Sequence, residues 1–75
     1  MYHMEEKKIV NLQICDEVVS LKISDKDEET VRYAAKKLND RANAIKEQNP
    51  SLKTSSLLAC LALEECIGNI KRAIR

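Results

Sequence analysis

The sequence has no tryptophan and no phenylalanine, and only two of its 75 residues are tyrosine. A core without large aromatic side chains has to be built from leucine, isoleucine, valine and alanine, which favours packed helices over an aromatic-lined cofactor pocket. The single glycine, Gly68, excludes a glycine-rich phosphate-binding loop. The single histidine, His3, has no cysteine or carboxylate at a spacing typical of a nucleophile pair or a metal site. We therefore expect no cofactor and no metal ion.

An excess of charge of one sign is also missing. The chain has 13 basic and 12 acidic side chains, for a formal net charge of +1, whereas a nucleic-acid-binding domain normally carries a strong positive field. No apolar run approaches the roughly 18 residues that indicate a membrane span, and the N-terminus has no hydrophobic core of a signal peptide. We expect a cytoplasmic protein with no nucleic-acid partner and no membrane partner.

The length of the chain indicates one domain with a small core. Residues 1–7, with a second methionine at Met4, are expected to be a flexible leader or a cloning remnant, and residues 8–75 to form the domain. The three cysteines are odd in number, lie in apolar surroundings and show no paired C-x-x-C spacing, which predicts buried, reduced thiols rather than a disulfide framework or a zinc site: Cys15, Cys60 and Cys66.

Residues 8–23 alternate apolar and polar side chains with a period of two, which is typical of strands. If Asp16 and Glu17 are the central residues of a tight turn, the apolar side chains of the two strands share one face. A bulge or a longer loop is the alternative to this turn. The predicted pairs are Cys15 with Val18, Ile14 with Val19, Leu12 with Leu21, and Val10 with Ile23.

An amphipathic helix is predicted to follow, from about Ser24 to Asn49. Ser24 and Asp27 form a variant of the capping box at its start, and Pro50 prevents it from continuing beyond Asn49. Asn39 lies beside the apolar stripe, so its amide is expected to cap or bridge neighbouring elements. The expected buried stripe is Val31, Ala34, Ala35, Leu38, Ala42 and Ile45.

A second helix, from Thr54 or Ser55 onwards, carries two apolar lines. One has the three-and-four spacing of a coiled-coil seam: Cys60, Leu63, Ile67, Ile70 and Ile74. The other lies beside it: Ala59, Ala62, Cys66 and Ala73. The predicted fold class is therefore α+β, a β-hairpin followed by two α-helices (ββαα), with the second helix leading into a coiled coil.

Two apolar lines on one helix need two partners, and the first helix and hairpin cover only one of them. Burying a leucine or isoleucine contributes roughly 1.5–3 kcal/mol, so leaving a whole seam exposed would forgo about as much as the net stability of a small domain. We therefore predict a homodimer whose second helices pair along the seam. No stop signal follows Ile74, so the chain is expected to end within the coil, and Gly68 is interpreted as a close approach of neighbouring backbone.

No constellation of charged residues indicates catalysis. Glu64 and Glu65 are adjacent, but neighbours on a helix point about 100° apart and do not share a substrate as paired catalytic carboxylates do. The basic residues of the first helix alternate with acids, so they form either a solvated face or a protein-docking patch: Lys36, Lys37, Arg41 and Lys46.

Three segments resemble the bacterial cell-division protein ZapA family: "LQICDEVVSLKI" in the predicted hairpin, "AAKKLNDR" at residues 34–41, and "NPSLKTSSLLACLAL" at residues 49–63. The resemblance covers nearly the whole chain from Ile9 to Ile74. It implies a ββαα head whose second helix continues into a coiled coil, assembly into dimers and often antiparallel tetramers, and cross-linking of filaments of the tubulin-like protein FtsZ.

The resemblance also implies that charged residues of the head contact the filament. Lys46 lies where some relatives have a lysine near the end of the first helix, and Glu17 lies where some relatives have arginine. The candidate partner-binding residues are Lys46, Arg41, Glu17 and Lys22. The function predicted is a non-enzymatic protein that bundles FtsZ filaments at the division septum; the alternative is a generic homodimeric coiled-coil adaptor or a regulatory subunit of another cytoplasmic complex.

Overall fold

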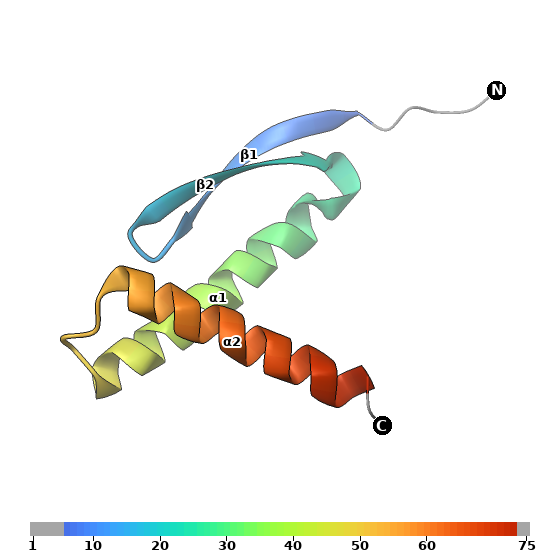
Figure 1. Cartoon of the computed structure of the whole chain (residues 1–75). Helices are drawn as coiled ribbons and strands as arrows, with labels where there is room; N and C mark the ends of the chain where they lie inside the picture. Colours follow the sequence, from blue (N-terminus) through green and yellow to red (C-terminus); the bar gives the residue numbers. More distant parts are fainter. Residues whose placement is uncertain (1–5, 74–75) are drawn as a thin grey trace. The chain divides into compact units, whose positions relative to one another are not determined.

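A computed structural model describes residues 6–73 and confirms the predicted α+β class with ββαα order (Figure 1). Strands β1 (Lys7–Ile14) and β2 (Glu17–Ser24) form an antiparallel hairpin, and a 3₁₀ turn (Asp25–Asp27) leads into helices α1 (Glu28–Gln48) and α2 (Thr54–Ala73). The chain divides into two compact units, Met1–Asn39 and Asp40–Arg75, so the boundary falls within α1. Each unit is described separately.

The register of the hairpin differs from the prediction by two residues. Leu12 pairs with Val19 and Val10 with Leu21, and the two central residues of the turn are Cys15 and Asp16 instead of Asp16 and Glu17. Cys15 has a φ of 58°, a left-handed conformation that is uncommon for residues other than glycine. A shift of two residues keeps every side chain on its predicted face, so the alternation alone did not distinguish the two registers.

The side chain of Asn39 explains where the turn forms. Its Oδ1 accepts a hydrogen bond of 2.7 Å from the backbone N–H of Cys15, and its Nδ2 donates one of 2.7 Å to the carbonyl of Gln13. These two backbone groups point away from β2, so the amide of Asn39 occupies the place of a neighbouring strand at the outer edge of β1. The prediction that Asn39 bridges two elements is confirmed.

The two strands are unequally covered on the apolar face of the hairpin. Val10 and Leu12 of β1 are buried, whereas their partners Val19 and Leu21 on β2 remain 38% and 40% exposed. We call these four residues the inner face of the hairpin. The described chain thus covers the β1 half of the inner face and leaves the β2 half open to solvent.

The start of α1 differs in detail from a capping box. Ser24 is buried and its hydroxyl donates to the Asp27 carboxylate over 3.1 Å, but its side chain makes no hydrogen bond to a backbone N–H. The chain therefore enters α1 through the 3₁₀ turn, and the α-helix begins at Glu28. Along α1, Ala34 of the predicted stripe is exposed. The other members of the stripe are at least half-buried: Val31, Ala35, Leu38, Ala42 and Ile45.

In the second unit, α1 ends as predicted just before Asn49 and Pro50. The backbone N–H of Asn49 still bonds to the carbonyl of Ile45 at 3.1 Å, and a short connection leads to α2. The buried apolar residues of this unit are Ala42 on α1 and Leu57 and Leu61 on α2. The covered line of α2 is therefore neither of the two lines predicted from the sequence.

The burial predicted for the cysteines is wrong for α2. Cys60 and Cys66 are exposed and Cys15 is half-buried, and all three are free thiols. Cys66 lies on the opposite side of α2 from the Leu57–Leu61 line and Cys60 lies beside that line, and both side chains are exposed to solvent.

The interpretation of Gly68 as a close backbone approach is also wrong within the described chain. A Cβ placed on Gly68 would meet only the guanidinium nitrogens of Arg72, at 3.5 and 4.0 Å, which is ordinary contact with a flexible side chain.

We therefore expect Gly68→Ala to stabilise the protein by up to about 1 kcal/mol, because alanine restricts the unfolded chain and favours the helix. Urea unfolding followed by circular dichroism measures this change. A loss of stability instead would show that a second molecule approaches Gly68 closely.

Candidate interaction surfaces

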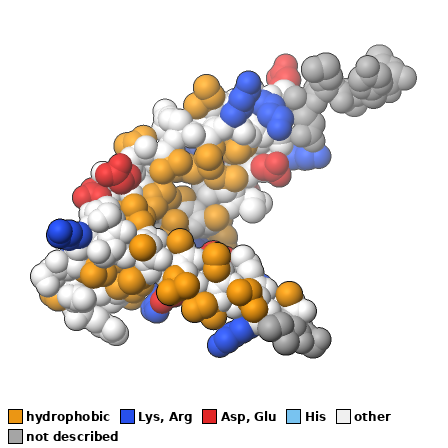
Figure 2. Space-filling view, in the orientation of Figure 1, with side chains coloured by type: hydrophobic (Ala, Val, Ile, Leu, Met, Phe, Trp, Pro, Cys, Tyr) orange, Lys and Arg blue, Asp and Glu red, His pale blue; other side chains and the backbone are white. Residues whose placement is uncertain are grey.

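The predicted coiled-coil seam is an exposed apolar stripe along α2. Within the described residues, Leu63, Ile67 and Ile70 are 63%, 44% and 59% exposed, and Cys60 is exposed as well. Figure 2 shows hydrophobic side chains along α2 on the face in view. Ile74, the last residue of the predicted seam, lies outside the described residues. We refer to Cys60, Leu63, Ile67 and Ile70 as the α2 seam.

The second predicted line of α2 is exposed too: Ala59, Ala62, Cys66 and Ala73. Sequence reasoning assigned one of the two lines to the first helix and hairpin, but the buried positions are Leu57 and Leu61. The apolar surface that α2 presents to solvent is consequently wider than predicted.

Arg41, a candidate partner-binding residue, is held by an ion pair within the second unit. Its Nε and Nη2 contact the two carboxylate oxygens of Glu64 at 2.9 and 2.7 Å, a bidentate arrangement that ties α1 to α2. The hydrogen bonds and charge of Arg41 lower the pKa of Glu64, and Glu64 in turn raises the pKa of Arg41. Glu64 thus has a structural partner on α1, which the sequence analysis did not identify.

Lys46 is engaged in the connection between the helices. Its Nζ donates a hydrogen bond of 2.7 Å to the backbone carbonyl of Leu52. Lys46 and Arg41 are five positions apart on α1, about 140° around the helix, so they lie on different sides of it. The structure does not bring these two candidate residues together into one patch.

Glu17 and Lys22 are both exposed on β2 but point to opposite faces of the hairpin. Glu17 shares the inner face with Val19, while Lys22 lies on the outer face, opposite Ile9. Neither side chain makes a hydrogen bond or an ion pair within the described part of the chain. Of the four candidate residues, these two have uncommitted charges.

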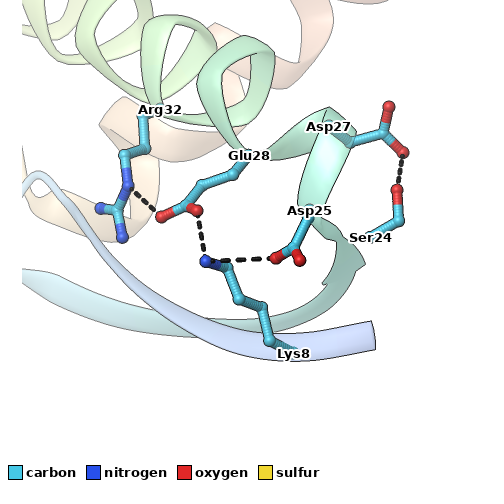
Figure 3. Close-up of polar contacts among 6 residues, drawn as sticks. All are labelled: Lys8, Ser24, Asp25, Asp27, Glu28 and Arg32. Atoms are coloured by element: carbon cyan, nitrogen blue, oxygen red, sulfur yellow. Dashed lines mark hydrogen bonds and ion pairs between the residues drawn. The ribbon is translucent and has the colours of Figure 1, made fainter. Parts of the chain in front are cut away.

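A network of four charged residues, missed by the sequence reasoning, joins the start of β1 to the start of α1 (Figure 3). Lys8 forms ion pairs with Asp25, at 3.3 Å, and with Glu28, and Glu28 also accepts a hydrogen bond of 2.9 Å from Arg32. The ion pair between Glu28 and Arg32 could have been predicted from the sequence, because the two residues are four positions apart on a helix. The ion pairs of Lys8 could not, because the hairpin has to fold before Lys8 comes close to Asp25 and Glu28.

This network and the Asn39 amide hold the hairpin to the first half of α1 at two places. The amide acts at the turn end of the hairpin and Lys8 acts at its open end. Lys8 and Arg32 lower the pKa of Glu28, and Glu28 and Asp25 raise the pKa of Lys8. These contacts therefore fix the position of the hairpin relative to the first half of α1.

The lowered pKa values of Glu28 and Glu64 predict that the protein loses stability in acid. A carboxyl group with a lower pKa in the folded state binds protons less readily there than in the unfolded chain. Its contribution is present above the ordinary pKa of glutamate and disappears as pH falls through the lowered folded value. We expect the free energy of unfolding to fall between about pH 6 and about pH 3.

Urea titrations across this pH range measure the decline. Glu64→Gln should make it shallower, while Glu65→Gln, at a neighbouring exposed acid with no ion pair in the described chain, should leave it unchanged. Equal pH profiles for the parent and Glu64→Gln would contradict the assigned role of the Arg41–Glu64 pair.

The described residues offer no group of three or more histidine, cysteine, aspartate or glutamate side chains placed to hold a metal ion. Within residues 6–73, neither helix has the length and hydrophobicity required to span a bilayer. The features of the described chain with interaction potential are thus the α2 seam, the half-exposed strand β2 and the charged residues around them.

The family model described as "Cell division protein ZapA" matches residues 10–69, from the hairpin through most of α2. The chain belongs to the ZapA family. Searches of curated proteins and of solved structures returned no significant match. The ZapA family is a non-enzymatic family of the division ring, and membership makes the chain a cell-division protein associated with FtsZ.

Proposed function

We propose that this ZapA-family chain acts in the cytoplasm as a homodimer that cross-links FtsZ filaments at the division septum. The observation that carries the proposal is the exposure of the α2 seam on a helix whose buried line, Leu57 and Leu61, is already satisfied. A second copy that pairs along the same seam buries these apolar side chains and gives an assembly with two identical heads.

Two heads in one assembly provide the mechanical basis for cross-linking. A filament repeats its binding site many times, so a bivalent dimer whose single head binds weakly can still hold two filaments together. A single head would bind one filament only. Bundling should therefore depend on the α2 seam, whereas simple binding to a filament should not.

Pelleting of purified FtsZ filaments tests this distinction. The parent chain should increase the FtsZ recovered at low centrifugal speed, which collects bundles. A variant with a disrupted seam, Ile67→Asp, should still co-pellet with filaments at high speed but should not increase the low-speed pellet. If the parent chain is verified as a folded dimer and does not increase the low-speed pellet, the cross-linking function is wrong.

The filament-binding residues remain a proposal. Lys46, Arg41, Glu17 and Lys22 are the candidate contacts, and the structure favours Glu17 and Lys22, because the charged groups of both are exposed and make no hydrogen bond or ion pair within residues 6–73. We expect Lys22→Glu to weaken high-speed co-pelleting, and Lys53→Glu, the same change at an exposed residue before α2, to have little effect. Equal co-pelleting of both variants would remove Lys22 from the contact surface.

A further inference from the structure

Strand β2 has one edge without a strand neighbour in the described chain. The sheet of residues 6–73 contains only β1 and β2. Leu12 with Val19 and Val10 with Leu21 are hydrogen-bonded pairs, because the ladder alternates from the Ile14–Glu17 pair next to the two-residue turn. The backbone N–H and C=O groups of the intervening residues point outward. We call the backbone groups of Val18, Ser20 and Lys22 the β2 outer edge.

The opposite edge of the hairpin is different. On β1 the outward carbonyl of Gln13 and the N–H of Cys15, at the first turn residue, are occupied by the side chain of Asn39. An additional strand along that edge would have to displace both hydrogen bonds. The hairpin thus has one blocked edge and one open edge.

Two of the usual protections of an open edge, proline and a bulge, are missing from β2. Proteins guard exposed edges with proline, with bulges and with charged side chains, lysine especially; the charges of β2 are Glu17 and Lys22, which flank an uncharged stretch. Strand β2 contains no proline, and its pairing with β1 continues without a bulge from Lys7–Ser24 to Ile14–Glu17. Between Glu17 and Lys22 it carries no charge, and Val19 and Leu21 stay 38% and 40% exposed. The edge has the features of a strand that pairs with another strand.

We propose that the β2 outer edge pairs antiparallel with the β2 outer edge of a second copy of this chain, with Ser20 opposite Ser20 on the two-fold axis. In this register the outward groups of Val18, Ser20 and Lys22 meet those of Lys22, Ser20 and Val18 of the second copy. Val19 lies opposite Leu21 of the second copy on the inner face, and Leu21 opposite Val19. One register satisfies the hydrogen bonds and pairs the exposed aliphatic side chains.

Neighbouring registers fit less well. A shift that sets Leu21 opposite Leu21 brings the two Lys22 ammonium groups into diagonal contact on the outer face. A shift that sets Val19 opposite Val19 reduces the overlap to residues 17–21, because Glu17 then opposes Leu21. With Ser20 on the axis, the strands overlap over residues 17–23 and no like charges face each other.

The β2 outer edge is a self-association surface separate from the α2 seam. Two hairpins joined in this way form a continuous four-stranded sheet whose remaining edges are the two β1 strands blocked by Asn39. If different copies occupy the edge and the seam, the two contacts alternate and join dimers into larger assemblies. The pairing does not depend on FtsZ binding.

Ser20→Pro tests the pairing directly. Proline removes the outward N–H of Ser20, which the hairpin itself does not use, and proline is tolerated on an edge strand where the N–H faces solvent. Ser20→Ala is the matched control, because both variants lose the hydroxyl that donates to Asn11 at 2.6 Å. In the proposed dimer the N–H of Ser20 in each copy donates to the carbonyl of Ser20 in the other copy. Ser20→Pro removes both of these hydrogen bonds, whereas Ser20→Ala keeps them.

Sedimentation equilibrium and NMR give the two measurements. We expect Ser20→Pro, verified as folded by its NMR spectrum, to weaken self-association by about tenfold or more relative to Ser20→Ala. In the proposed register, Val19 of one copy and Leu21 of the second copy form a non-hydrogen-bonded pair, which brings their Hα atoms close together. A mixture of isotope-labelled and unlabelled parent chain should therefore show an inter-subunit nuclear Overhauser effect between these two Hα atoms. Equal self-association of the two variants, or absence of this inter-subunit effect, overturns the proposal.

Discussion

Replacing Ile67 with aspartate is expected to weaken dimerisation by on the order of 100-fold or more. Ile67 lies in the middle of the α2 seam and is 44% exposed in the single chain, so a carboxylate there is solvated as long as the chain is alone. In the dimer the same change places two carboxylates in an apolar helix interface, where they are poorly solvated and repel each other. The head should remain folded at concentrations where the parent is folded.

Sedimentation equilibrium of Ile67→Asp measures this effect. Asn69→Asp is the matched control, because it adds the same charge two residues away on the same helix, at an exposed position off the seam. The control should dimerise like the parent. If Ile67→Asp keeps the dimer constant of the parent, the seam is not the interface, and the bivalent mechanism of bundling loses its support.

Replacing Asn39 with alanine is expected to destabilise the protein by about 1–3 kcal/mol. The change removes two hydrogen bonds of 2.7 Å and leaves the carbonyl of Gln13 and the N–H of Cys15 without their protein partner. It also removes the tether at the turn end of the hairpin, so the backbone amide of Cys15 should exchange its hydrogen faster with solvent.

Asn43→Ala is the matched control for this prediction. Asn43 is exposed one turn further along α1 and takes no part in the hairpin, so its replacement should be neutral or slightly stabilising through helix propensity. Asn39→Asp keeps the acceptor for Cys15 but turns a carboxylate oxygen toward the carbonyl of Gln13, so it should not rescue stability. Urea unfolding measures the free energy of unfolding of each variant. Equal stability of Asn39→Ala and Asn43→Ala would contradict the bridging role of Asn39.

Much of the fold could be predicted because local patterns determine it. The alternation in residues 8–23, the helical stripe around Leu38 and Ala42, and the stop at Pro50 placed the strands and helices close to their observed bounds. The hairpin register could not be predicted in the same way. Two registers that differ by two residues bury the same face, and the group that distinguishes them, the amide of Asn39, lies more than 20 residues away in sequence.

The interaction surfaces were predictable in a similar, partial way. The three-and-four spacing from Cys60 to Ile70 identified a stripe that is exposed in the single chain. Periodicity did not show that Leu57 and Leu61 form the covered line, since a helix that is apolar on several sides does not indicate which side meets its neighbour. The ion pairs of Arg41 and Lys8 depend on tertiary contacts and have no signature in sequence spacing.

The central claim is that a second copy of this chain covers the apolar surface of α2. Sedimentation equilibrium of the parent chain over a wide range of concentrations, with the helical content of the same samples measured by circular dichroism, tests it most directly. The account predicts an assembly of at least two chains that dissociates on dilution into folded but less stable single chains, because the single copy buries few apolar side chains. A single chain that stays fully folded at every concentration would contradict it.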